Sequence, residues 1–178
     1  MYQNQLVTKS QIQQKCKKIK LVITDVDGVL TDGGRYYSET GEKLKKFHTR
    51  DGMGVNLLLR NNIKTIILTK EKSKITRKWA KEMNISYVYE GLTKKEIAIP
   101  KICKRFNLLP ANFAFIGDDI NDLEVFKKVG FSATPNDAVE QSKTLADYVC
   151  KAKGGEGAFR EITDLILHTK LPTRIKWY

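Results

Sequence analysis

The sequence predicts an α/β fold with a parallel β-sheet flanked by helices, because short apolar runs alternate with longer amphipathic stretches. The apolar runs have the length of buried strands and lie at residues 21–24, 65–68, 87–89, 113–116 and 148–150. Apolar residues recur near helical spacing at residues 75–83, 95–106, 123–129 and 138–145. A chain of 178 residues is long enough for one domain with a sizeable core and short for two.

Residues 33–47 do not follow this alternation and predict a protruding β-hairpin, because strand-forming residues flank a turn-rich centre at 38–41. We expect one domain over residues 19–170. Residues 1–18 are expected to form an N-terminal extension, helical or frayed. Residues 171–178 form a C-terminal tail, whose Trp177 and Tyr178 either dock or stay loose.

The composition favours an anionic partner and a reducing compartment. Lys and Arg number 32 against 20 for Asp and Glu, which gives a formal net charge of +12. The basic residues are spread along the chain without interleaved aromatic residues, so a solvated basic surface is favoured over a nucleic-acid interface. Cys16, Cys103 and Cys150 are too few and too far apart for a disulfide framework, which indicates a cytoplasmic protein. No apolar run approaches the length of a membrane span, so no membrane partner is expected.

Two carboxylates follow the first predicted strand. Asp25 and Asp27 are two residues apart, so in an extended chain both side chains point to the same side. Their mutual repulsion is costly unless a cation shares the space, which implies a divalent metal. The alternative is an ordinary turn, with Asp27-Gly28 as the turn pair and Asp25 as a helix cap.

Polar residues also follow other predicted strands, and ligands bind outside the carboxyl ends of strands in open α/β sheets. Thr69 follows one strand, Lys95 lies near the start of a later helix, and residues 117–122 read Gly-Asp-Asp-Ile-Asn-Asp. Carboxylates, a hydroxyl and an ammonium on one rim suit a phosphoryl group and Mg²⁺, which prefers oxygen ligands. Because the chain lacks a Gly-x-x-x-x-Gly-Lys-Ser/Thr loop, a carboxylate nucleophile is favoured over a nucleotide-cradling site.

The order Asp-x-Asp, Thr, Lys and acidic cluster resembles the haloacid dehalogenase superfamily, whose phosphatases have a Rossmann-like sheet. Five segments are more narrowly similar to the capless 3-deoxy-D-manno-octulosonate 8-phosphate phosphatase family and its relatives, the phosphatases of nine-carbon nonulosonate 9-phosphates. These segments are residues 24–33, 40–42, 50–52, 117–119 and 153–161. The resemblance implies a Mg²⁺-dependent enzyme that hydrolyses 3-deoxy-D-manno-octulosonate 8-phosphate, a reaction of lipopolysaccharide biosynthesis, through an aspartyl phosphate.

The resemblance also implies catalytic roles for three residues. Asp25 would be the nucleophile, Asp27 the general acid and base, and Lys95 the group that balances charge on Asp25 and the transferring phosphoryl group. Lys94 competes with Lys95 for this role, although the register favours Lys95.

The implied metal site holds Mg²⁺ through the Asp25 carboxylate, the Asp27 backbone carbonyl and Asp118, with Asp122 orienting the metal shell. Asp119 is either a helix N-cap or a direct part of the site.

The implied substrate-binding residues are Thr69, Lys70, Asp32, Arg160 and Lys153. Thr69 would hydrogen-bond the phosphate, with an ordinary strand cap as its alternative. Lys70 stands where the family usually has Gly, which would retune substrate choice or impair turnover. Lys70 therefore also suggests a catalytically silent assembly domain.

Glu71, the Thr31–Gly34 context and the Lys45–Phe47 context are similar to the nine-carbon variant, so a sialic-type nine-carbon 9-phosphate is the alternative substrate.

No insertion is long enough for a cap domain between Asp32 and Thr69 or between Thr69 and Lys95. Resembling proteins form tetramers in which hairpins build a central barrel and the C-terminal glycine-rich segment reaches a neighbour's site. This implies a homotetramer in which Arg160 or Lys153 recognises the substrate carboxylate in trans. The alternative for both residues is simple solvent-exposed charge.

Overall fold

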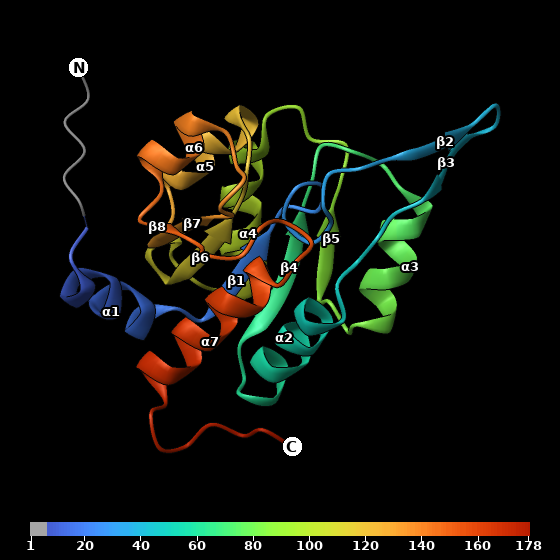
Figure 1. Cartoon of the computed structure of the whole chain (residues 1–178). Helices are drawn as coiled ribbons and strands as arrows, with labels where there is room; N and C mark the ends of the chain where they lie inside the picture. The colour runs from blue at the N-terminus through green and yellow to red at the C-terminus, as the bar shows by residue number, and fades with distance from the viewer. Residues whose placement is uncertain (1–6) are drawn as a thin grey trace.

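A parallel sheet forms the centre of the described part of the chain, residues 7–178 of a computed structural model (Figure 1). Its strands run in the order β5-β4-β1-β6-β7-β8, and every pair is parallel. The strands are β1 (Leu21–Thr24), β4 (Lys64–Leu68), β5 (Tyr87–Tyr89), β6 (Phe113–Ile116), β7 (Phe131–Thr134) and β8 (Tyr148–Val149). The predicted α/β fold class is confirmed.

Helices cover both faces of the sheet, as Figure 1 shows. They are α1 (Lys9–Lys18), α2 (Thr49–Arg60), α3 (Lys74–Glu82), α4 (Ile99–Phe106), α5 (Leu123–Phe126), α6 (Glu140–Leu145) and α7 (Ala158–Lys170). Three short 3₁₀ turns, η1 (Lys95–Ala98), η2 (Pro110–Asn112) and η3 (Ile120–Asp122), precede α4, β6 and α5.

The strands divide their side chains between two cores, because successive residues of a strand point to opposite faces. On β1, Val22 packs in the core that contains α1, α2 and α7, whereas Leu21 and Ile23 pack in the core that contains α4 and α5. β1 is buried along its whole length between β4 and β6. This burial on both faces explains why the strand reads as a continuous apolar run.

The hairpin lies apart from the sheet and extends beyond α3 (Figure 1). It consists of β2 (Tyr36–Ser38) and β3 (Gly41–Leu44), which pair antiparallel, and a bridge between Thr31 and Phe47 closes its base. This confirms the predicted protrusion.

Three elements were not among those predicted. β7 contains Ser132 and Thr134, which weaken its apolar signal, yet all of its residues are buried. α2 carries Gly52 and Gly54, which lower helix propensity. A Cβ at these positions would lie 2.7 Å from Met83 Sδ and 2.9 Å from Thr163 Oγ1, so close packing explains both glycines. The helical extent of α7 was also missed.

The two ends of the described chain contact the domain. Thr8 caps α1 through a capping box with Gln11, and Cys16 is buried in the core. In the tail, the backbone of Lys176 forms hydrogen bonds with the Asn61 side chain at 2.9 and 3.1 Å. Part of the expected N-terminal extension, residues 1–6, lies outside the described residues. No helix in the range 7–178 has the length and apolar character needed to cross a membrane.

Candidate active site

The candidate site lies at the carboxyl ends of β1, β4 and β6, where a cavity of about 260 Å³ opens. The chain continues from β1 to β4 on one side and later to β6 on the other, so this is the switch point at which open α/β sheets bind ligands. The cavity is lined by Asp25, Asp27, Gly28, Gly33, Arg35, Thr69, Lys70, Glu71, Asp118, Asp119 and Asn121.

Asp25 leaves the end of β1 and is paired with a buried lysine. Lys95 Nζ, which is fully buried, donates to Asp25 Oδ2 at 2.5 Å and to Asp122 Oδ1 at 2.6 Å. The second oxygen of Asp25 accepts the Val26 N–H at 2.7 Å. Burial raises the pKa of Asp25 to about 6, although the charge of Lys95 opposes this rise. Lys94 is exposed, so the geometry favours Lys95 over its neighbour.

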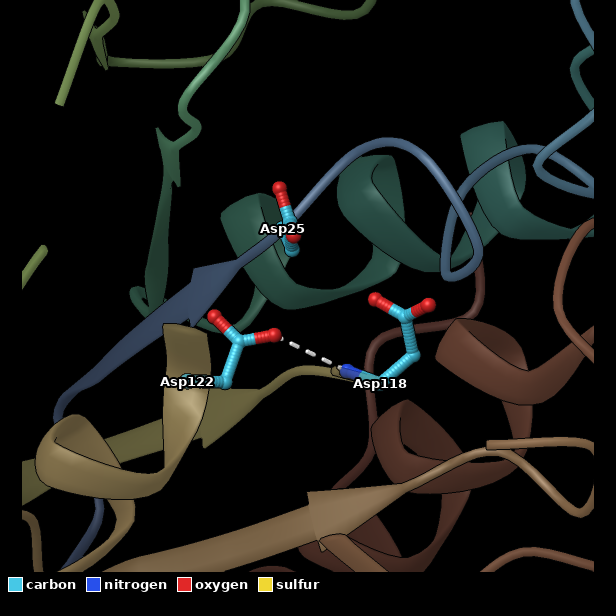
Figure 2. A group of neighbouring side chains, drawn as sticks. All are labelled: Asp25, Asp118 and Asp122. Carbon is cyan, nitrogen blue, oxygen red and sulfur yellow. Dashed lines mark hydrogen bonds between the residues drawn. The ribbon is translucent and has the colours of Figure 1, made fainter. Parts of the chain in front are cut away.

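Asp118 and Asp122 bring two further carboxylates to Asp25 (Figure 2). The three residues each offer an oxygen, and these oxygens lie within 4.8 Å of one another. Asp122 Oδ2 accepts the backbone N–H groups of Asp118 and Asp119 at 3.0 and 3.3 Å, which fixes its orientation. Asp119 itself caps η3 by accepting the Ile120 N–H, and it also lines the cavity.

Asp118 is the least satisfied carboxylate of this group. Burial, followed by the negative charges of Asp25 and Asp122, raises the pKa of Asp118 to about 8. Its Oδ1 atom is buried and has no hydrogen-bond partner among the described residues. The ammonium of Lys95 pairs with Asp25 and Asp122, and no ion pair joins it to Asp118 among the described residues. An oxygen-rich, electron-rich cluster with one unpaired buried oxygen fits a hard divalent cation such as Mg²⁺.

The loop after β1 is shaped by a glycine that permits this approach. Gly28 has a φ of +83°, and a Cβ at this position would lie 2.0 Å from Asp118 Oδ2. Any other residue at position 28 would therefore be strained and would displace the Asp118 carboxylate.

The glycine-rich segment that precedes α7 packs against the same loop. Gly155 N–H donates to Val29 O at 2.9 Å, and a Cβ on Gly154 would lie 2.0 Å from Gly28 O. α7 is in turn held by Asp51 at the start of α2, whose Oδ1 accepts the Arg160 N–H at 2.8 Å.

Asp27 faces the hairpin side of the cavity. Its Oδ1 atom accepts from Lys45 Nζ, and its Oδ2 atom lies 3.4 Å from an Arg35 nitrogen. Arg35 also pairs with Glu71 Oε1 at 3.3 Å, which links the loop after β1 to the loop after β4.

The loop after β4 supplies a hydroxyl and a cation. Thr69 is buried, and its Oγ1 atom accepts the Glu71 N–H at 3.3 Å. Lys70 is exposed and lines the cavity. The structure thus places Thr69 beside the carboxylates, as the strand-end argument predicts, and Lys70 lines the same cavity.

Three residues predicted to bind substrate do not line this cavity within the described chain. Asp32 pairs with Lys46 at 3.2 Å, and Arg160 Nε donates to Asp164 at 2.8 Å. Lys153 is exposed.

Arg35, Lys45 and Asn121 were missed by the sequence reasoning. Asn121 lies inside the Gly117–Asp122 motif, and this could have identified it, whereas the resemblance of residues 45–47 to the nine-carbon variant does not by itself place Lys45 in the site.

Known proteins are similar to this chain over most of its length. Residues 57–162 match the family model of haloacid dehalogenase-like hydrolases. The 3-deoxy-D-manno-octulosonate 8-phosphate phosphatase of Haemophilus influenzae is 40% identical over 89% of this chain and 88% of its own sequence.

Solved structures agree with this similarity. A cobalt-bound form of the Haemophilus influenzae enzyme has a TM-score of 0.86 at 40% identity, covering 88% of this chain and 92% of its own. The Moraxella catarrhalis enzyme in complex with magnesium, phosphate and KDO has a TM-score of 0.88 at 35% identity, covering 92% and 94%.

Proposed function

Since this chain belongs to the haloacid dehalogenase-like hydrolases and, among them, to the 3-deoxy-D-manno-octulosonate 8-phosphate phosphatase family, we propose that it hydrolyses 3-deoxy-D-manno-octulosonate 8-phosphate to the free sugar acid and phosphate. The observation that carries the proposal is the Asp25 carboxylate, which lies between a buried lysine and an acidic cluster at the end of β1. We further propose that this reaction belongs to lipopolysaccharide biosynthesis.

Asp25 acts as the nucleophile. One of its carboxylate oxygens attacks phosphorus, and the bond between phosphorus and the sugar oxygen breaks as Asp27 gives that oxygen a proton. A water molecule then attacks the aspartyl phosphate, passes its proton to Asp27 and releases Asp25 and inorganic phosphate. Lys95 offsets negative charge on Asp25 throughout, and its two ion pairs hold the nucleophile in place.

Mg²⁺ is the cofactor that fits the acidic cluster. The Asp25 carboxylate, the Asp27 backbone carbonyl and Asp118 would hold it, and Asp122 would orient the metal shell. When bound, Mg²⁺ neutralises negative charge on the phosphate and on the cluster. The unpaired Asp118 oxygen supports this assignment.

Thr69 and Lys70 bind the phosphoryl group from the loop after β4, with Asp32 as a further substrate-binding residue nearer the hairpin. Thr69 offers its hydroxyl and Lys70 its backbone N–H and ammonium. The position of Thr69 and Lys70 on the cavity wall supports these roles.

The assembly is a cytoplasmic homotetramer, in which Arg160 or Lys153 of one subunit recognises the substrate carboxylate in the site of another. Exposed Tyr36, Tyr37 and Leu44 on the hairpin support an interface there. The catalytic domain spans residues 19–170, and residues 1–18 and 171–178 are extensions.

The alternative substrate is a nine-carbon 2-keto-3-deoxy acid 9-phosphate. Glu71 lines the cavity and is held by Arg35, so a carboxylate is available to a longer polyol chain. A panel of eight-carbon and nine-carbon acid phosphates, compared by kcat/KM, separates the two substrates.

The Asp25→Asn variant tests the chemistry, with Asp147→Asn as a matched control because Asp147 pairs with Lys15 and Ser132 away from the cavity. We expect Mg²⁺-dependent hydrolysis of the sugar-acid phosphate by the wild type and by Asp147→Asn, and a loss of at least about 10³-fold in Asp25→Asn. An Asp25→Asn protein as active as wild type toward an aryl phosphate would overturn the proposal. A wild type without Mg²⁺-dependent turnover would instead favour the silent assembly domain.

A further inference from the structure

A second buried lysine, Lys45, pairs with Asp27, the other aspartate of the Asp-x-Asp motif. Lys45 follows β3 of the hairpin, and its side chain is completely buried although much of the hairpin is exposed. Its ammonium pairs with Asp27 Oδ1 and with Glu42 Oε1, the latter at 3.3 Å. A buried ammonium is costly unless charged partners surround it, so this placement is a specific one.

Glu42 connects this lysine to the body of the domain. Ser73 Oγ donates to Glu42 Oε2 at 2.7 Å, and Ser73 is the N-cap of α3, where it accepts the Thr76 N–H at 3.3 Å. Ser73 is buried. A continuous set of contacts therefore runs from α3 through Glu42 and Lys45 to Asp27, and the hairpin is fixed to the domain on the side that faces the cavity.

Asp27 depends on these contacts for its orientation. Its carboxylate lies in the loop that follows Asp25, beyond the end of β1, and its hydrogen bonds come from Lys45 and, more weakly at 3.4 Å, from Arg35. A group that gives a proton to a leaving oxygen must be held in line with that oxygen, because small misplacements reduce the rate strongly.

We infer that Lys45 is a positioning residue for Asp27: held by Glu42, its ammonium fixes one carboxylate oxygen of Asp27 so that the other is presented to the leaving group. The inference rests on the proposed function, since it presumes the acid and base role of Asp27. It assigns the hairpin a part in the chemistry of its own subunit.

Lys45→Met tests this inference, because methionine keeps most of the length of the side chain and removes the charge. Lys43→Met is the matched control, because Lys43 lies in β3, two residues earlier, and is exposed. We expect Lys45→Met to lower kcat by about 10- to 100-fold with little change in KM, and Lys43→Met to behave as wild type. In single turnovers the loss should be larger for an alkyl phosphate than for an aryl phosphate, whose leaving oxygen needs no proton.

A double-mutant cycle with Asp27→Asn separates positioning from a general structural effect. If Lys45 acts through Asp27, adding Lys45→Met to Asp27→Asn costs little further activity. Two independent losses that multiply, or equal losses for alkyl and aryl phosphates, would overturn the inference.

Two milder variants keep the test decisive should Lys45→Met fail to fold. Glu42→Gln removes the anchor of Lys45 and should give a smaller loss of kcat with the same preference for alkyl substrates, whereas Glu39→Gln in the hairpin turn should give none. Lys45→Arg should restore part of the activity. Wild-type kinetics in Glu42→Gln would defeat the inference alone, whereas an inactive wild type would defeat the proposed function.

Discussion

Lys95 and Lys45 each have two carboxylate partners, but the partners of the two lysines lie in different parts of the fold. Each ammonium is buried between an aspartate of the Asp-x-Asp motif and a second carboxylate: Asp25 and Asp122 for Lys95, Asp27 and Glu42 for Lys45. The contacts of Lys95 belong to the rim of the central sheet, and the Asp25 and Asp122 side chains are 8% and 0% exposed. Lys45 and its partner Glu42 belong to the hairpin, Asp27 lies in the loop after β1, and the Asp27 and Glu42 side chains are 19% and 18% exposed.

This difference indicates that separate parts of the fold hold the two aspartates of the Asp-x-Asp motif. In the proposed mechanism, the group that attacks phosphorus is held by the core of the fold, whereas the group that moves protons is held by the hairpin. Changes in the hairpin can therefore alter proton transfer and leave the nucleophile undisturbed.

The largest expected effect is that of Lys95→Met on stability. The change leaves Asp25 and Asp122 buried without their cation, and breaking a buried ion pair in this way costs about 3–5 kcal/mol. Urea denaturation of the metal-free protein at pH 7 measures the loss. A cost below about 1 kcal/mol would show that water reaches Asp25 and Asp122 as readily as it reaches Asp27 and Glu42, and the two lysines would then not differ in this respect.

Asp51 shows what happens to a buried carboxylate that has no lysine beside it. Its Oδ2 atom has no partner in the described part of the chain, and burial raises the pKa of Asp51 to about 6 despite the opposing effects of the Arg160 N–H and of His48 and Arg160. Its charge also acts on the buried thiol of Cys150. Because the folded pKa lies above the usual value of 3.8, the folded state holds the proton more tightly.

Folding is therefore favoured by protonated Asp51 at low pH, and this contribution is lost as the pH rises from about 4 to about 6. Relative to Asp51→Asn, the free energy of unfolding of the wild type should fall across this window by on the order of 3 kcal/mol. Chemical denaturation of both proteins at pH 4, 5, 6 and 7 measures it. Parallel stability profiles would contradict the prediction.

Asp118→Asn tests whether the cation binds at the rim of the sheet and not at the hairpin. Wild type should gain about 2–3 kcal/mol at Mg²⁺ concentrations near 100 times its dissociation constant, and Asp118→Asn should gain almost none. Thermal unfolding with and without Mg²⁺ tests this, with Asp119→Asn as the comparison because Asp119 caps η3. Equal stabilisation of wild type and Asp118→Asn by Mg²⁺ would remove Asp118 from the metal site.

The smallest expected effect is the stability change in Lys45→Met. Because Asp27 and Glu42 are partly exposed, water can replace the lost ammonium, and we expect a cost of about 1 kcal/mol. Lys43→Met should cost close to nothing under the same denaturation assay. A loss as large as that of Lys95→Met would mean that Lys45 is chiefly structural.

Residues close to a strand end could be predicted from the sequence, because the fold class dictates where strand ends meet. Asp25, Thr69 and Asp118 each follow an apolar run, and the structure brings them to one cavity. Lys95 was placed near the site by its position at the start of a helix.

Lys45 and Arg35 could not be found in this way, because their place depends on how the hairpin folds back on the loop after β1. Such a contact joins residues through the geometry of a protruding element, and a lysine in a basic run looks like any solvated lysine until that geometry is known. The glycines of α2, which lower helix propensity, are present for a related reason, since Gly52 packs against Met83 at the end of α3 and Gly54 against Thr163 of α7.

The contact of Gly154 and Gly155 with the loop after β1 joins residues that are synthesised far apart in time. Residues 24–33 are among the first of the domain to leave the ribosome, whereas Gly154 and Gly155, which brace them, are among the last. A nascent chain that ends before residue 153 carries the acidic pair but lacks its final support. Activity should therefore arise only after Gly154 and Gly155 have emerged.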